Sequence, residues 1–486
     1  MKTVVLYNPF APYHTIPLHF LALASVLDKS KYAIKIIDAR VEPDVDSAHQ
    51  QVSELLRTSV CLGVSVITGS SIRDAVAVTR MAKRQSPQVP VVWGGWHPSI
   101  YPEQCLREGP ADFTVGGQGE HAFRELLDAI KGGAAVDSIA GVSFIRDGVC
   151  IKGPDRAMTD VNTFPPHDYG LLDLEKYFQR KRRRQVDFLS SQGCPYRCSF
   201  CADPAVYHHR WSSLNADRLL SDVSDILGRY SVEDIHFLDE NFFADRKRVI
   251  AFSQAIVERG LRFSWAATSR ADQIAPLSDD LLAMIARAGL RKVNIGAESG
   301  SQDMLDRMKK DTLTEETVIS AEKLSRHRIN AMFNFIIGLP GEQPSQLRET
   351  FRVIRKIKKI NPRFGIGLFY FTPYPGTELF EEIVKQGHRL PASLAEWCQV
   401  DFDTYAGQWV AAEDRRRIDL FRFYAEMGTQ WGTREPFSTV LRGIGSFRIR
   451  HDYLRLPIEK QLIISARRAM RGFMSRSIGA QGENQH

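Results

Sequence analysis

The stretch of sequence that decides the fold and the chemistry is Ser191-Gln192-Gly193-Cys194-Pro195-Tyr196-Arg197-Cys198-Ser199-Phe200-Cys201. Three cysteines at C-x3-C-x2-C spacing can place three thiolates on one iron–sulfur cluster, and thiolate-rich loops select iron–sulfur clusters or zinc over hard cations. Three ligands leave one iron of a four-iron cubane without a protein ligand. Zinc is the alternative here, because His208 or His209 could complete a four-ligand set.

A short apolar run, residues 186–190, leads into the cysteines as a predicted buried strand, and Gly193 and Pro195 mark the loop that leaves it. The whole stretch resembles the cluster loop of the radical S-adenosylmethionine (SAM) superfamily, including the aromatic Phe200 before the last cysteine. The resemblance implies a 4Fe–4S cluster whose open iron chelates the amino and carboxylate groups of SAM, and an electron transfer that cleaves SAM to a 5′-deoxyadenosyl radical. The cluster ligands that it implies are Cys194, Cys198 and Cys201.

Length and composition indicate a soluble globular protein of two or three domains. The chain has 486 residues, 43% of them hydrophobic and 25% charged. No apolar run reaches the roughly 18 to 20 residues of a membrane span, and the opening residues resemble a first strand that meets Pro9 rather than a signal peptide. Seven cysteines, four of them scattered, argue against a disulfide framework. We therefore expect a cytoplasmic protein.

Positive charge is concentrated in two places. Of the net charge of +7, most lies from Arg442 onward, where nine Lys/Arg face three Asp/Glu, and a second basic run covers residues 180–184. An acidic membrane surface or an anionic substrate could use such patches. A solvated tail and linker explain them equally well, and we expect no nucleic-acid partner.

Strand and helix patterns alternate over residues 1–135, which predicts a doubly wound parallel sheet. The strand-like runs are 4–7, 33–37, 61–66, 91–93 and 112–115, and helical segments lie near 18–27, 47–56, 72–84 and 120–130. Small, glycine-rich loops follow three of the strands, at 65–71, 94–98 and 116–120, on the edge where such sheets bind ligands. Neither a G-x-G-x-x-G fingerprint nor a G-x-x-x-x-G-K-[ST] loop is present, which disfavours dinucleotides and nucleoside triphosphates.

This pattern resembles the cobalamin-binding domain that precedes the barrel in one large branch of the radical SAM superfamily. The matching pieces are Gly63-Val64-Ser65 with Thr68-Gly69, and residues 92–98. By analogy, hydroxyl groups contact the nucleotide tail of cobalamin and glycines admit it. The residues implied are Ser65, Thr68, Gly69, Gly94 and Gly95.

One feature of other cobalamin proteins is missing. They carry D-x-H-x-x-G after the first strand, with a histidine that ligates cobalt, whereas residues 8–17 of this chain show no such match. Because the radical SAM branch commonly lacks that histidine, we expect cobalt without a lower protein ligand. His14 and His97 are the alternatives, and a polar surface position is the simpler interpretation of each.

Residues 136–185 are predicted to form a linker, with a hairpin (141–144 and 150–152) and a Pro165-Pro166 turn. From 186 to 390 the alternation resumes in six longer strand–helix units, which, together with the radical SAM resemblance, predict an open partial (β/α)6 barrel. The strand-like runs are 186–190, 234–238, 263–268, 291–297, 332–337 and 365–371, and helical runs lie near 213–229, 246–259, 278–288, 314–327, 345–359 and 376–386.

Polar groups and turn residues follow each of these strands, where barrel enzymes place their active residues. Carboxylates suit an ammonium group or ribose hydroxyls, and arginine suits a carboxylate. The resemblance assigns Asp239 and Glu240 to the SAM amino group, Arg270 and Glu298 to its carboxylate and ribose, and the later loops with Gly338 and Pro373 to adenine. Ordinary capping and turn chemistry could explain any one of these residues, but not five loops together.

Residues 391–486 match nothing specific. Frequent aromatic residues predict a small, mostly helical cap over the barrel mouth that recognises the substrate. Residues 458–474 could form a basic amphipathic helix, which either docks on the protein or lies on a membrane surface and faces a lipid-like substrate.

Taken together, the resemblances imply a cobalamin-dependent radical SAM enzyme that methylates an unactivated carbon of a small molecule. Its cofactors would be a 4Fe–4S cluster, SAM and cobalamin, and its electron donor a flavodoxin or ferredoxin. The absence of a second cysteine triplet favours cobalamin over a sulfur-inserting relative with another cluster. The alternatives are a cyclase or rearrangement enzyme with the same cofactors, a radical SAM enzyme whose first domain binds no cobalamin, and a non-enzymatic cobalamin sensor.

Overall fold

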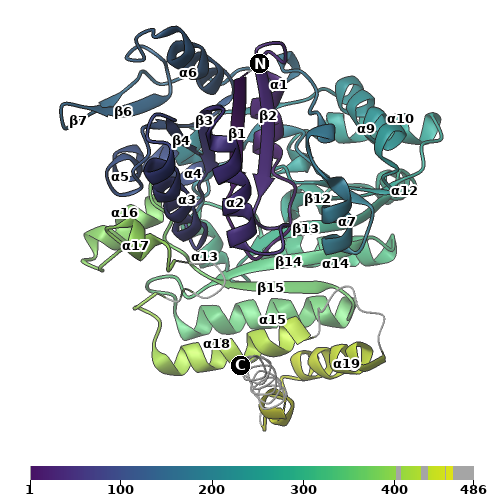
Figure 1. The fold of residues 1–486 in the computed structure, drawn as a ribbon. Helices are drawn as coiled ribbons and strands as arrows, with labels where there is room; N and C mark the ends of the chain where they lie inside the picture. Colours follow the sequence, from purple (N-terminus) through teal and green to yellow (C-terminus); the bar gives the residue numbers. More distant parts are fainter. Residues whose placement is uncertain (1, 401–404, 406, 428–435, 455, 463–486) are drawn as a thin grey trace, which may run out of the picture.

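The structure is a computed structural model that describes residues 2–400, 405, 407–427, 436–454 and 456–462. Two parallel sheets, one in each half of the chain, dominate it, and helices cover their outer faces (Figure 1). The described residues contain no helix that is both long enough and apolar enough to cross a membrane.

The first sheet has the strand order β2-β1-β3-β4-β5-β6-β7, in which the first five strands run parallel. Its strands are β1 (Lys2–Asn8), β2 (Tyr32–Asp38), β3 (Ser59–Ser65), β4 (Val91–Gly94), β5 (Phe113–Val115), β6 (Val142–Arg146) and β7 (Val149–Lys152). The predicted hairpin forms as β6 and β7, but it pairs antiparallel with β5 and extends the first sheet instead of standing in a separate linker. Without it, the backbone groups of β5 would be an open edge.

Alternating side chains of β1 show why the sheet needs helices on both faces. Val4 and Leu6 pack with residues of α1 and α6, whereas Val5 and Tyr7 pack with residues of α2 and α3. A strand buried on both faces is a continuous apolar run, which is why the sequence pattern located it. The helices of this half are α1 (Leu18–Ser25), α2 (Val45–Leu56), α3 (Ser71–Gln85), α4 (Trp96–Ile100), α5 (Pro102–Glu108) and α6 (Glu120–Gly132).

The second sheet has six parallel strands in the order β15-β14-β13-β12-β11-β8. They are β8 (Gln185–Phe188), β11 (Asp234–Phe237), β12 (Ser264–Arg270), β13 (Leu290–Glu298), β14 (Asn330–Ile337) and β15 (Gly365–Tyr370). β8 and β15 do not pair with each other, so the barrel is partial and open, as predicted.

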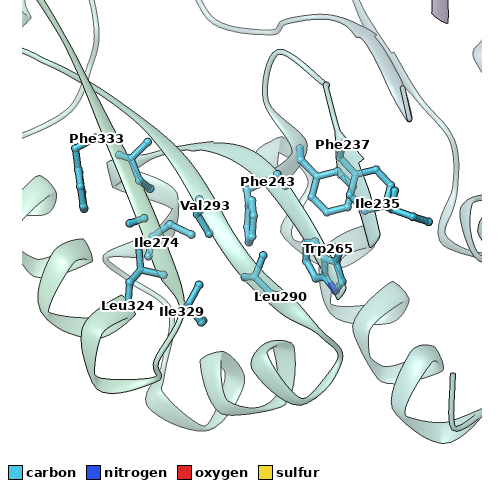
Figure 2. Packing of buried hydrophobic residues seen from close by; sticks show 14 of the residues in the cluster. Ile235, Phe237, Phe243, Trp265, Ile274, Leu290, Val293, Leu324, Ile329 and Phe333 are labelled. Carbon is cyan, nitrogen blue, oxygen red and sulfur yellow. The ribbon is translucent and has the colours of Figure 1, made fainter. Parts of the chain in front are cut away.

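Helices follow the strands of this barrel and bury its outer surface. They are α9 (Ala216–Tyr230), α10 (Arg246–Glu258), α11 (Ala271–Ile274), α12 (Asp279–Arg287), α13 (Gln302–Arg307), α14 (Thr314–Arg326), α15 (Pro344–Ile360) and α16 (Glu378–Lys385). Figure 2 shows Trp265 of β12 and Val293 of β13 in this layer, with Leu324 of α14 below the strands. Because this core fixes the strands, their carboxyl ends are held in register.

The segment between the two sheets is tied to both of them. Tyr177 of α7 (Leu174–Lys181) donates to Asp38 at 2.7 Å, and the backbone N–H of Ile16 donates to Asp187 of β8 at 2.7 Å. Lys181 contacts the same carboxylate at 2.6 Å. The basic run at 180–184 is therefore largely used within the protein, since Arg183 and Arg184 also make ion pairs, with Asp234 and Glu175.

The C-terminal region is helical, but its long helices lie elsewhere than predicted. α18 (Ala412–Met427) packs against β15 and α19 (Pro436–Arg450) against α15, with Phe421 stacked on Phe351 at a centroid distance of 3.9 Å (Figure 1). α18 covers the edge strand β15, which would otherwise expose an apolar face, rather than the barrel mouth, and α19 packs on α18 and α15. Parts of the described C-terminal residues do reach the strand ends. Trp397 of α17 (Leu394–Trp397) packs against His97 after β4, and Trp409 donates to Gly338 after β14. Tyr370, the last residue of β15, donates to Asp419 of α18 at 2.7 Å. Most of the predicted helix at 458–474, from 463 onward, lies outside the described residues.

Candidate functional site

The carboxyl ends of the two sheets face each other across a cavity of about 350 Å³. The first half of the chain contributes the loops after β1, β3, β4 and β5, and the barrel contributes residues that follow β8 and β11. The barrel residues are Leu189, Gln192, Val206, Tyr207, Leu238 and Glu240. The edges of the two sheets at which ligands are predicted to bind therefore line the same cavity.

The cluster loop is fixed by backbone contacts on both sides. β9 (Ser191–Gly193) pairs antiparallel with β10 (Trp211–Ser213). Gly193 has φ +75°, and a Cβ there would lie 2.1 Å from the carbonyl oxygen of Arg210, so only glycine fits. The N–H of Cys201 donates to Cys198 O at 3.1 Å, and that of Ser199 donates to Met308 O at 2.9 Å. The loop is thus anchored before any metal binds.

The three thiols of this loop form no disulfide and are partly buried. Burial raises the pKa of Cys194 to about 11 and raises the pKa values of the other two thiols as well. At Cys198 the charges of Lys310 and Arg270 oppose that effect of burial, whereas the charge of Asp203 adds to it at Cys194 and Cys201. Protonated, buried thiols become ligands when a metal displaces their protons, so the donor set fits an iron–sulfur cluster.

The zinc alternative is not supported. Within the described residues, no group of three or more His, Cys, Asp or Glu side chains is placed to hold a single metal ion. His208 and His209 are exposed, and His209 Nδ1 lies 3.4 Å from the backbone oxygen of Tyr196. A single zinc would require the thiols and one imidazole to converge, whereas a four-iron cubane spreads its ligands over separate irons.

Asp239 and Glu240, which were predicted to act together, have different surroundings. Asp239 is 1% exposed and accepts hydrogen bonds from the hydroxyls of Ser190, at 2.7 Å, and Ser191. It therefore holds the end of β8 that leads into the cluster loop. Glu240 is exposed, but to the interdomain cavity, where the surrounding protein raises its pKa well above the usual range and Asp203 adds to the effect. Glu240 is the carboxylate of the pair that a ligand can reach.

Arg270 lies against the cluster loop. Its Nη1 contacts Cys198 Sγ at 3.7 Å and its guanidinium stacks 4.0 Å from the ring centroid of Tyr196. Nε donates to Asp272 at 2.9 Å and Nη2 to Thr312 at 2.9 Å. With these donors engaged, Arg270 is positioned at a cluster ligand rather than in the open cavity.

Glu298 forms a buried ion pair with Lys310, a residue that the sequence analysis did not single out. Lys310 Nζ lies 2.8 Å from Glu298 Oε1, and Lys310 is 6% exposed. Burial lowers the pKa of Lys310, but Glu298 and Cys198 raise it and the net shift is upward. Glu298 has φ +56° at an irregularity of β13, a conformation that costs about 1–3 kcal/mol. A lysine in a polar loop gives no sequence signal of burial.

A second cavity, of about 420 Å³ and mainly apolar, brings predicted residues of both halves together. Thr68 and Gly69 line it from the first half, and Phe200 and Cys201 line it from the cluster loop. Its barrel wall is formed by Ile336 and Tyr374, beside Gly338 and Pro373. The carbonyl of Gly338 accepts a hydrogen bond from Trp409 Nε1 at 2.7 Å, so the C-terminal segment braces this loop.

The first cavity extends as a slot into the first sheet. Gly63, Ser65, Gly94 and Gly95 line it, together with apolar residues of α1 and α6. A Cβ at Gly63 would lie 2.8 Å from Leu6 Cδ2, and one at Gly95, whose φ is +107°, would lie 2.7 Å from Val66 O. An apolar slot that side chains would fill, edged by hydroxyls, fits the nucleotide tail of cobalamin.

The two histidines considered as cobalt ligands are engaged within the protein. His97 is wholly buried, not on the surface as expected; its Nδ1 bonds to Thr68 Oγ1 at 3.0 Å and its ring packs against Trp397. Burial lowers the pKa of His97 to about 4. His14 Nδ1 bonds to Arg40 O at 3.1 Å.

A polar chain that the sequence did not reveal joins the two halves beside the cavity. Gln192 Nε2 donates to the buried carboxylate of Glu120 at 2.7 Å, and Gln118 Nε2 donates to Gln192 Oε1 at 2.7 Å. Gln192 lies two residues before Cys194, and Gln118 lies in a glycine-rich loop of the first half. Residues this far apart in sequence give no local signal of contact.

Comparisons with known proteins agree with this geometry. Residues 188–354 match the family model of the radical SAM superfamily, and residues 6–127 match that of the B12 binding domain. An uncharacterised methyltransferase of Pyrococcus horikoshii is 29% identical over 392 residues, which cover 79% of this chain and 82% of that protein. The anaerobic magnesium-protoporphyrin IX monomethyl ester cyclase of Rubrivivax gelatinosus is 28% identical over 348 residues, 70% of this chain and 61% of that protein.

Among solved structures, the radical S-adenosylmethionine methyltransferase TsrM from Kitasatospora setae, with cobalamin and a [4Fe–4S] cluster bound, has a similar fold. The TM-score is 0.71 at 19% sequence identity, and the match covers 97% of this chain and all of that one (100%). The likeness therefore extends over both sheets and the C-terminal region.

Proposed function

We propose that this chain, which belongs to the radical SAM superfamily and carries an N-terminal B12-binding domain, is a cobalamin-dependent enzyme that methylates a carbon atom of a small-molecule substrate. One observation supports the proposal above all others: the cavity that Phe200 and Cys201 line adjoins the cavity of the glycine-lined slot, because both are lined by residues such as Ile67 and Trp96. When bound, the cluster would supply the electron that cleaves SAM to a 5′-deoxyadenosyl radical, and cobalamin would carry the methyl group.

The barrel residues would hold and orient the cluster and SAM. We propose that Cys194, Cys198 and Cys201 bind three irons, and that Glu240 accepts the SAM ammonium beside the fourth. Glu298, fixed by Lys310, would accept the ribose hydroxyls. The loops with Gly338 and Pro373, together with Phe200, would enclose adenine in the second cavity.

The first half would hold cobalamin mainly by shape. We propose that residues 1–135 bind it, with Gly94 and Gly95 admitting the nucleotide tail and Ser65 and Thr68 offering hydroxyls. Residues 136–185 connect this unit to the barrel at 186–390. The segment 391–410 would contribute to substrate selection, because Trp397 of α17 packs against His97 after β4 and Trp409 donates to Gly338 after β14.

A one-electron donor of the flavodoxin or ferredoxin class would reduce the cluster, since the proposed reaction starts from a reduced iron–sulfur centre. An oxygen-sensitive centre of this kind suits the cytoplasm. A second function, ring formation with the same cofactors, is favoured by the similarity to the cyclase of Rubrivivax gelatinosus. The fate of a labelled SAM methyl group separates the two functions, because only methylation transfers the label to the substrate.

The test is anaerobic reconstitution with iron, sulfide and hydroxocobalamin, followed by incubation with methyl-labelled SAM and a strong reductant. We expect bound cobalt, release of 5′-deoxyadenosine, and label retained by the cobalamin fraction. Replacing all three cluster cysteines with alanine should abolish 5′-deoxyadenosine, whereas Cys150→Ala, at a partly exposed cysteine of β7 outside the loop, should leave it unchanged. Continued release from the triple variant would refute the site, and absence of bound cobalt would refute the role of the first half.

A further inference from the structure

The three cluster cysteines do not share one electrostatic environment. Two cations act on Cys198: Arg270, whose Nη1 lies 3.7 Å from its sulfur, and Lys310. Cys194 and Cys201 instead face Asp203, and Cys194 also faces Glu240. Burial raises the pKa of Asp203 to about 7 and that of Glu240 well above its usual range, so both carboxyls lose negative charge near neutral pH. A cluster held by this loop would therefore have one charged side, the positive wall that Arg270 and Lys310 form at Cys198.

The cations of the positive wall are held in place and shielded from water. Arg270 is 4% exposed and Lys310 is 6% exposed. Nη2 of Arg270 donates to the backbone oxygen of Lys310, so the two residues are also joined to each other. Charges in such surroundings act more strongly and are screened less by salt than charges on the surface.

The ion pair with Glu298 does not cancel the positive wall. Both the cation of Lys310 and the anion of Glu298 act on Cys198, and the effect of Lys310 is the larger of the two. Arg270 adds to it, with its own carboxylate partner, Asp272, directed toward Nε, while Nη1 contacts the sulfur. Two cations therefore oppose a single anion at Cys198, and one of the cations contacts the sulfur directly.

We infer that Arg270 and Lys310 raise the reduction potential of the cluster by stabilising its reduced state through Cys198. Reduction adds one electron, supplied by the external flavodoxin- or ferredoxin-class donor, and so makes the cluster more negative by one charge. Net charge and hydrogen bonds at the ligand sulfurs are among the factors that set cluster potentials. The two cations would thus make this cluster easier for its donor to reduce. The inference rests on the proposed cluster site but not on the identity of the substrate.

The test is a redox titration of the reconstituted full chain without SAM. The low-temperature electron paramagnetic resonance signal of the reduced cluster measures the reduced fraction at each potential. Lys310→Met should titrate at a more negative potential than wild type. The matched control is Lys309→Met, the same change one residue away, where the lysine is exposed and paired with Glu378. Its potential should equal that of wild type. Equal potentials for Lys310→Met and wild type would overturn the inference.

Two further variants keep the test decisive. Glu298→Gln removes the opposing anion and should shift the potential in the positive direction. If Lys310→Met loads no iron because Glu298 is left unpaired, the double variant Lys310→Met/Glu298→Gln contains no orphaned charge. Its potential should still lie below that of wild type, and a value equal to or above wild type contradicts the inference. If wild type itself binds no cluster, the proposed function fails instead, so the two failures are distinguishable.

Discussion

The two ends that face each other across the cavity are built by opposite means. The barrel end presents thiols and charged side chains, and some of the charged groups are fixed by a partner, as Glu298 is by Lys310. The first-domain end presents positions without side chains, such as Gly63 and Gly95, whose backbone leaves no room for a Cβ. The comparison indicates that one end binds through ligand chemistry and the other through shape. Substitutions should therefore act as all-or-none changes at the barrel and as changes in fit at the first domain.

The largest effect is expected from Cys198→Ala. Loss of one of three protein ligands should prevent stable cluster assembly, so both iron content and 5′-deoxyadenosine formation should fall to the level of the triple variant. Cobalamin binding should persist, because the glycine-lined slot lies on the other side of the cavity. Iron, cobalt and product are counted on the same preparation. Loss of both cobalt and iron would contradict the view that the two ends bind their cofactors independently.

The next largest effect is expected from Gly63→Val, which should remove cobalt rather than iron. A branched side chain would fill the slot and collide with Leu6, so bound cobalt should be lost while iron is retained. Overpacking of this kind also costs about 1–3 kcal/mol of stability. Gly228→Val is the matched control, because no atom lies within 4 Å of a Cβ there. A variant that binds cobalamin as wild type does would show that the slot is not the binding site.

A smaller effect concerns the pH dependence of stability that the buried His97 of α4 confers. Its pKa is about 4 in the fold against 6.5 for an ordinary histidine, so the unfolded chain binds the extra proton first as the pH falls. Stability from this residue is complete above pH 6.5 and is lost between 6.5 and 4, by about 2 kcal/mol at pH 5. Unfolding measured at pH 7 and pH 5 should show that loss, and His97→Gln should remove it. An unchanged pH dependence in the variant would contradict the burial argument.

The smallest effect is expected from Arg197→Gln. Arg197 adjoins Cys198, but its ion pair with Asp311 is exposed, with side chains 66% and 50% accessible. Exposed pairs contribute about 0–1 kcal/mol, so stability and iron content should stay close to wild type. Thermal unfolding and iron analysis check this. A clear loss of cluster would mean that proximity in sequence matters more than burial.

The strands and their order of appearance could be predicted from the sequence because both sheets are covered by helices. Strands buried on both faces are continuous apolar runs, and β1 was located in this way. In β13 and β14 buried and partly buried residues alternate, with apolar residues at the buried positions apart from Glu298. Polar residues after such strands must gather at one edge, so Glu240 and Glu298 could also be placed near the cysteines.

The remaining features depend on contacts that are distant in sequence. Lysine is almost never fully buried without a partner, so nothing marked Lys310 until Glu298 was found beside it. Asp239 was expected to meet a ligand, whereas in the structure it accepts hydrogen bonds from the hydroxyls of Ser190, which follows β8, and Ser191 of β9. The long C-terminal helices were expected over the barrel mouth, whereas α18 packs against the apolar edge strand β15 and α19 packs against α15.

The central claim is that two adjoining cavities between the facing sheet ends hold the cluster and cobalamin at the same time. Pulsed electron paramagnetic resonance on protein that contains the reduced cluster and cob(II)alamin measures the dipolar coupling between the two spins. The account predicts a short-range coupling within each molecule, and its disappearance when the three cluster cysteines are replaced with alanine. Two strong signals without any mutual coupling would contradict the account, because the facing ends of the two sheets would then not be where the cofactors bind.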